Sequence, residues 1–219
     1  ENSQLIVFGC QNNYAITESV EKYLSDCKRY AKKHGVYLVT DRVILANSLG
    51  MFLIDAKGNV LGGQKALTLN LTYTNLLLKG EEVCCIDTPC GKIFMCIDTD
   101  IYSPQIMRMA SFLGCNIVIS SQYINTADYS EERILFGAYN VSQSNGLFVI
   151  NTNNNGSSFI CPQINSDNDG FVISPTGLLP LTSIMNLEYM SKHDFSEKIF
   201  SILNTKFCDD NADHLYQIT

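Results

Sequence analysis

The stretch GKIFMCIDTDIYSPQ, Gly91–Gln105, decides how this chain folds. Its first seven residues include the apolar run 93–97, which is typical of a buried strand, and Pro104 suits the first turn of a helix. Two carboxylates, Asp98 and Asp100, lie between the strand and the helix. A strand that turns sharply into a helix presents the side chain at the bend beyond the end of the sheet. We therefore predict that Asp98 lies at an elbow.

Apolar runs and amphipathic segments alternate on both sides of this elbow. Strands are predicted at residues 5–8, 36–39, 83–86, 93–97, 116–120 and 147–151, a strand pair within 43–61 around the turn Asp55–Gly58, and a last hairpin starting at 170–177. Helices are predicted from a cap at Thr17 to His34, over 104–114, and over 131–144. The polar stretch 151–158 is predicted to be a long surface loop. This alternation indicates an α/β fold, and the hairpins indicate mixed sheets. We expect residues 1–219 to form a single domain.

The composition excludes several classes of partner. The formal net charge of −7 gives no basic field for a phosphate backbone, so no nucleic acid is expected. No apolar run approaches the roughly 20 residues of a membrane span, so no membrane partner is expected. Nine cysteines without a CxxC pair favour buried thiols in a reducing cytoplasm over disulfides or a zinc site. We therefore predict a cytoplasmic protein with no metal and no cofactor.

The elbow segment resembles the nucleophile segment of the nitrilase (carbon–nitrogen hydrolase) superfamily, in which a Gly-Lys-Ile strand leads to a catalytic cysteine. A gap-free alignment that matches Gly91, Asp100 and Pro104 puts that cysteine at Asp98. Similar segments span 5–8, 55–65, 79–92, 110–119, 145–151 and 175–177. The resemblance implies an α-β-β-α sandwich that lacks the family's first strand and helix.

The same resemblance implies a degenerate catalytic triad. The family hydrolyses amides and nitriles with Glu, Lys and Cys, and these positions hold Cys10, Lys65 and Asp98. An aspartate nucleophile would form a mixed anhydride with an amide, and the tetrahedral intermediate would expel the carboxylate in preference to the amine. An unperturbed thiol is mostly protonated at neutral pH and is a poor base. We therefore expect a catalytically inactive homologue, a pseudoenzyme that serves as a binding or assembly subunit.

Other interpretations of the same residues stay open. Thiol and carboxylate have exchanged places, so a divergent amide hydrolase is an alternative, with Cys10 as nucleophile, Asp98 as base and Lys65 as charge stabiliser. Lys65 and Asp98 also suit a purely structural ion pair. A small-molecule-binding sensor module is a further alternative. Cys96, in the Cys-Ile-Asp sequence that imitates the family motif, is interpreted as a buried core thiol because its alignment requires gaps.

The resemblance also predicts a pocket and an assembly surface. Asp100, Gln122 and Asn145 are expected to line the pocket, and a small amide or carboxylate is its expected ligand. The helices at 104–114 and 131–144 are expected to mediate a homodimer or pairing with a paralogue. The loops 69–75 and 123–129 carry no motif that identifies the substrate.

Overall fold

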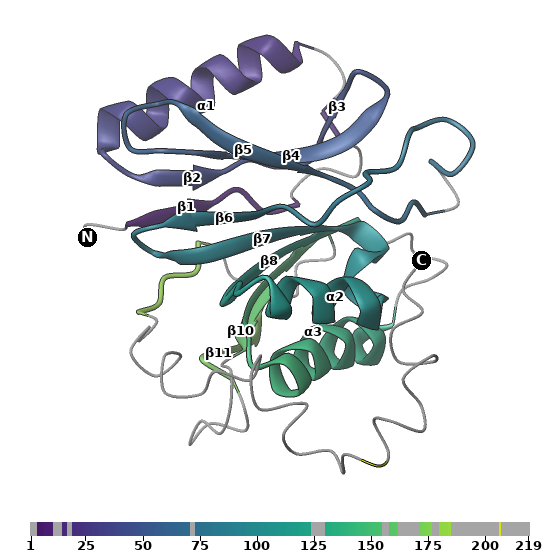
Figure 1. Ribbon diagram of the computed structural model, residues 1–219. Helices are drawn as coiled ribbons and strands as arrows, with labels where there is room; N and C mark the ends of the chain where they lie inside the picture. Colours follow the sequence, from purple (N-terminus) through teal and green to yellow (C-terminus); the bar gives the residue numbers. More distant parts are fainter. Residues whose placement is uncertain are drawn as a thin grey trace.

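Two β-sheets stack face to face between helices (Figure 1). The computed structural model of this 219-residue chain describes residues 4–10, 15–16, 19–70, 73–123, 130–154, 158–161, 171–176, 180–184 and 206. One helix covers the outer face of the first sheet, and two helices cover the outer face of the second. The layers therefore follow the expected α-β-β-α order.

The first sheet comes from the N-terminal part of the chain. Its strands are β1 (Leu5–Val7), β2 (Tyr37–Val39), β3 (Val43–Leu45), β4 (Ser48–Ile54) and β5 (Val60–Lys65). β1 and β2 are parallel, and β4 pairs antiparallel with β2, β3 and β5. The β4–β5 turn forms as predicted, because the Asp55 carboxylate accepts hydrogen bonds from the Lys57 and Asn59 amides and Gly58 adopts a φ of 86°.

The second sheet has the order β11-β10-β9-β8-β7-β6. Its strands are β6 (Cys85–Thr88), β7 (Gly91–Ile97), β8 (Ile117–Gln122), β9 (Phe148–Asn153), β10 (Ser158–Cys161) and β11 (Ile173–Thr176). The central strands β7, β8 and β9 are parallel, and the outer pairs are antiparallel. Both sheets are therefore mixed.

Side-chain alternation along β7 builds two separate cores. Ile93, Met95 and Ile97 pack between the sheets, whereas Phe94 and Cys96 pack under α2 (Pro104–Phe112) and α3 (Glu131–Asn145). The helix α1 (Val20–His34) ends at Gly35 in the left-handed conformation, and it packs Cys27 and Ala31 on the first sheet. Thr17, its expected cap, lies outside the described residues. Within the described part of the chain, no helix is long and apolar enough to cross a bilayer.

Two expectations are wrong. The stretch 151–158 is not one surface loop, because β9 continues to Asn153, with Asn151 fully buried, and β10 starts at Ser158. The Asn151 amide oxygen accepts a hydrogen bond from Gln122, whereas its Nδ2 has no partner among the described residues. The cysteines are not all free thiols either, because Cys85 and Cys115 form a disulfide.

Candidate active site

The elbow forms where β7 meets a short 3-10 helix, η1 (Asp98–Tyr102), which leads into α2. Asp98 is the residue at the bend, and its φ of 48° lies in the left-handed region that side chains rarely adopt. Aspartate and asparagine tolerate this region better than other non-glycine residues, because their short polar side chains bond locally. Asp98 is 3% exposed, so its carboxylate needs partners within the protein.

A buried arginine joins the elbow to Cys10. Arg42, in the connection between β2 and β3, is fully buried. Its Nη1 donates to Asp98 Oδ1 over 2.8 Å, and its Nη2 lies 2.8 Å from Cys10 Sγ. The Tyr123 amide donates to the same Asp98 oxygen over 2.8 Å, and Asn70 Nδ2 donates to the other oxygen over 3.4 Å. The guanidinium therefore bridges the carboxylate and the thiol.

The charges at this site favour a neutral thiol and a charged arginine. Burial raises the pKa of the Cys10 thiol to about 12, although Arg42 opposes the shift. Burial raises the pKa of Asp98, and the Arg42 guanidinium opposes this shift too. Burial alone would lower the pKa of Arg42, but Asp98, Cys10 and Asp41 together raise it. Asp41 Oδ1 lies 3.7 Å from Arg42 Nε, so two carboxylates face one guanidinium.

Lys65, the third expected member of the triad, does not join this cluster. It is exposed at the end of β5, whereas its neighbours Gln64 and Ala66 are buried. Successive side chains of a strand point to opposite faces, so this register directs Lys65 outward and gives the inward position to Ala66. Lys65 takes part in none of the ion pairs of the described residues. The structure thus brings Cys10 and Asp98 together, and Arg42 makes the ion pair that was expected from Lys65.

Asp100 fastens the β5 end to the elbow. Its carboxylate accepts hydrogen bonds from the Leu67 amide, from the Thr68 amide and hydroxyl, and from the Ile97 amide. Burial raises the pKa of Asp100 to about 6, in spite of these donors. Asp100 is completely buried, and its hydrogen bonds give it a structural role beside the site.

The other two expected pocket residues lie on the helix side of the second sheet. Gln122, at the end of β8, accepts a hydrogen bond from the Tyr102 hydroxyl over 2.8 Å and donates to Ser120 and Asn151. Asn145, at the end of α3, donates to the Val141 carbonyl and lines a pocket between α2 and α3. Cys96 is a fully buried thiol packed under the helices, as interpreted, and burial raises its pKa.

Comparisons with known proteins identify solved structures that share this fold. No family model matches the sequence, and a search of curated proteins finds no match. Among solved structures, a carbon–nitrogen hydrolase from Helicobacter pylori G27 is similar with a TM-score of 0.77 at 17% identity, over 95% of this chain and 85% of that one. A variant of the Nesterenkonia sp. AN1 amidase, described as a nitrilase-superfamily protein, gives 0.67 at 15%, over 92% and 85%. This chain has the nitrilase fold.

On the nitrilase fold, the Nesterenkonia amidase uses an active-site cysteine, to which the acetamide moiety of fluoroacetamide adds covalently. Within this chain's fold, the elbow carries Asp98, and the residue that sequence reasoning missed is Arg42. One signal marked it: the polar triplet Thr40, Asp41 and Arg42 interrupts two apolar strand runs. A charged triplet between buried strands is either a solvated turn or a buried polar centre, and only the packing of the sheets distinguishes them.

Proposed function

We propose that this chain is a catalytically inactive relative of the carbon–nitrogen hydrolases that serves as a binding or assembly subunit. One observation carries the proposal: Asp98, the residue at the elbow, is held in a buried 2.8 Å ion pair with Arg42. A carboxylate engaged in this way is a weak nucleophile. Its attack on an amide would also give an intermediate that reverts, because carboxylate leaves more readily than amine.

The Cys10 thiol does not replace Asp98 as a nucleophile. A nucleophilic cysteine must be a thiolate, and burial raises the pKa of Cys10 to about 12. Catalysis by the other route, with Asp98 as the base, requires this thiol to transfer its proton to the carboxylate. The Arg42 guanidinium donates to the Asp98 carboxylate and contacts Cys10 Sγ, so the carboxylate oxygen nearest to Arg42 is already engaged by a cation.

An amidase assay tests the inactive state. We expect acetamide, butyramide, small nitriles and N-carbamoyl compounds to turn over at the buffer rate, with no change in Asp98→Ala or Cys10→Ala. Cys27→Ala is the matched control, because Cys27 and Cys10 are both 2% exposed and Cys27 lies on α1, packed against the first sheet. Turnover that is lost in Asp98→Ala or Cys10→Ala and kept in Cys27→Ala would refute the proposal.

Assembly is proposed through the helices at 104–114 and 131–144. They lie side by side on the outer face of the second sheet (Figure 1), and α2 ends in the exposed apolar residues Phe112 and Leu113. Leu113→Arg is expected to lower the association constant, measured by sedimentation equilibrium. Leu61→Arg is the matched control, because Leu61 on β5 has the same 43% exposure. Equal effects of the two changes would speak against this surface.

A divergent amide hydrolase is the second candidate, and one contact favours it. Arg42 Nη2 lies 2.8 Å from Cys10 Sγ, and a cation beside a thiol stabilises its thiolate. Iodoacetamide labelling at pH 6–7, mapped by peptide mass spectrometry, separates the candidates. The inactive form predicts that Cys10 reacts no faster than Cys27. Selective alkylation of Cys10 would establish an activated thiolate and favour the hydrolase.

A further inference from the structure

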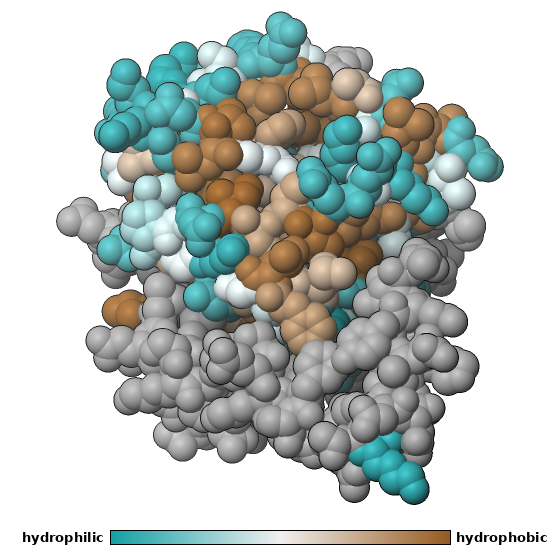
Figure 2. Space-filling view, in the orientation of Figure 1, coloured by the Kyte–Doolittle hydropathy of each residue, from teal (hydrophilic) through white to brown (hydrophobic). Residues whose placement is uncertain are grey.

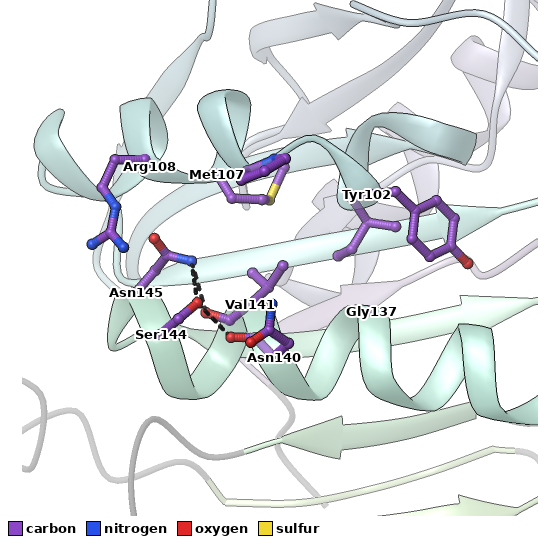
Figure 3. A pocket seen from close by; sticks show the side chains of 10 residues that line it. Tyr102, Met107, Arg108, Gly137, Asn140, Val141, Ser144 and Asn145 are labelled. Atoms are coloured by element: carbon purple, nitrogen blue, oxygen red, sulfur yellow. Dashed lines mark hydrogen bonds between the residues drawn. The ribbon is translucent and has the colours of Figure 1, made fainter. Parts of the chain in front are cut away.

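The pocket between α2 and α3 that Asn145 lines is on the helix side of the second sheet. It has a volume of about 220 Å³ and is bounded by α2, α3 and η1. Figure 3 shows Met107 and Arg108 entering from α2, Asn140, Val141 and Asn145 from α3, and Tyr102 from η1. Cys10, Arg42 and Asp98 do not line this pocket, although Asp98 begins the same short helix, η1, that supplies Ile101 and Tyr102.

One end of this pocket holds unsatisfied polar atoms. Arg108 Nη1 and Asn145 Oδ1 are both buried, and neither has a hydrogen-bond partner among the described residues. Arg108 and Asn145 both line this pocket, and in the view of Figure 3 their side chains are at the same end of it. Asn145 is 5% exposed, and its amide nitrogen is already used, since it donates to the Val141 carbonyl and to Ser144 Oγ. A buried donor and a buried acceptor left unpaired are costly, and a bound molecule that offers both complements relieves the cost.

Part of the remaining lining is apolar and firmly held, and Asn140 and Ser144 add polar groups to it. Ile101, Met107 and Val141 line the pocket and are buried. The Tyr102 ring is fixed by its hydroxyl, which donates to Gln122 Oε1 over 2.8 Å. The volume lies below the ~300–1,000 Å³ of pockets for drug-sized molecules. The pocket therefore suits a short ligand with one charged end.

We propose that this pocket binds a short carboxylic acid that carries an N–H or O–H donor a few bonds from its carboxylate, such as an amido acid. The carboxylate would accept from the Arg108 guanidinium, which favours planar, two-oxygen partners. The ligand's donor would bond to Asn145 Oδ1, and its carbon chain would lie against Met107 and Val141. This inference is independent of the elbow and of whether the chain hydrolyses amides.

Isothermal titration with N-acetylglycine tests the proposal, because this probe carries both groups. Butyrate lacks the donor and butyramide lacks the carboxylate, so each is expected to bind at least tenfold more weakly. Arg108→Gln should lower the affinity for N-acetylglycine about tenfold, and Arg108→Lys should recover part of that affinity. Arg29→Gln is the matched control and should leave binding unchanged, since Arg29 is exposed on α1 and pairs with Asp26.

A measurement on the unaltered protein guards against variants that fold poorly. N-acetylglycine should shift the NMR signals of the Arg108 side chain and the Asn145 amide, and leave those of Arg42 in place. The proposal is overturned if the unaltered protein does not bind N-acetylglycine, or if Arg108→Gln binds it as tightly as the unaltered protein does. It is equally overturned if the NMR shifts caused by N-acetylglycine centre on Arg42. It is also overturned if Arg108→Gln changes only the dimerisation constant, because the pocket is then part of an interface between copies.

Discussion

At the scale of single residues, the centre of this molecule is a buried arginine. Moving a guanidinium out of water costs several kcal/mol, and the cost is offset only when a partner of opposite charge and good geometry is present. Asp98 supplies that partner at 2.8 Å, and Asp41 adds a second carboxylate at 3.7 Å. Each member of the cluster therefore depends on the others, and removing one leaves an uncompensated charge.

Asp98→Ala is expected to lower the free energy of unfolding by about 3–5 kcal/mol, because it leaves Arg42 buried without its closest counter-charge. Urea denaturation measures this loss. Asp26→Ala is the control, since it breaks an exposed pair with Arg29 and should cost less than about 1 kcal/mol. If both changes cost the same, the buried pair contributes no more than a surface contact.

Asp100 is expected to make stability depend on pH. Its folded pKa of about 6 lies above the ordinary aspartate pKa of 3.8, so between these values the folded state binds more protons than the unfolded state. Stability contributed by this group is therefore present below about pH 4 and lost as pH rises through 6. The difference of about two pKa units corresponds to roughly 3 kcal/mol.

Urea unfolding of the unaltered chain and of Asp100→Asn, at pH 4, 5, 6 and 7, checks this dependence. Asp100→Asn removes the titration but also alters the bonds to Thr68, so a constant offset is expected between the two curves. The informative quantity is the difference in slope. Curves that run parallel over this range would show that Asp100 does not titrate there.

At the scale of elements, local chemistry predicted most of the fold. Gly35 ends α1, Pro104 starts α2, and the Asp55 turn joins β4 to β5, because each depends on backbone preferences that neighbouring residues determine. The register of β5 was not predictable in this way. A shift of one residue exchanges the two faces of a strand, and pairing with β4 directs Lys65 outward and Ala66 inward. Arg42 was missed for a related reason, because its partners Cys10 and Asp98 are remote in sequence.

Helix α3 offers a test of packing against η1. Gly137→Ala should raise helix stability by about 1 kcal/mol if backbone preference alone acted. Here an added Cβ would meet Tyr102 Cε1 at 2.6 Å, and this ring is held by Gln122 and lies under Arg133. Overpacking costs about 1–3 kcal/mol, so we expect net destabilisation in thermal unfolding. In a Tyr102→Ala background the sign should reverse; stabilisation in both backgrounds would show that the ring moves freely.

At the scale of the whole molecule, two sheets share one core and the helices close it on the outside. The resemblance to the nitrilase superfamily predicted this layering, and the solved structures agree on the fold. The disulfide between Cys85 and Cys115 was beyond reach of the sequence. Nine cysteines allow many pairings, and only the approach of β6 to the end of α2 selects this one.

This disulfide closes a loop with a sequence separation of 30, which corresponds to about 3–4 kcal/mol of stabilisation in the chain-entropy model. Reduction by dithiothreitol should therefore lower the melting temperature on the order of 10 °C. A double variant, Cys85→Ser with Cys115→Ser, should melt at the reduced temperature and not respond to dithiothreitol. A response that persists in the double variant would mean that another thiol pair is involved.

The same bond makes the protein a reporter of the compartment in which it is made. A chain folded in a glutathione-rich cytosol and one folded in an oxidising space would differ in mass by two hydrogen atoms and in heat tolerance. Mass spectrometry of protein from its native source, with free thiols blocked at the moment of lysis, would show whether Cys85 and Cys115 are oxidised. That result would indicate whether the chain folds in a reducing or an oxidising compartment.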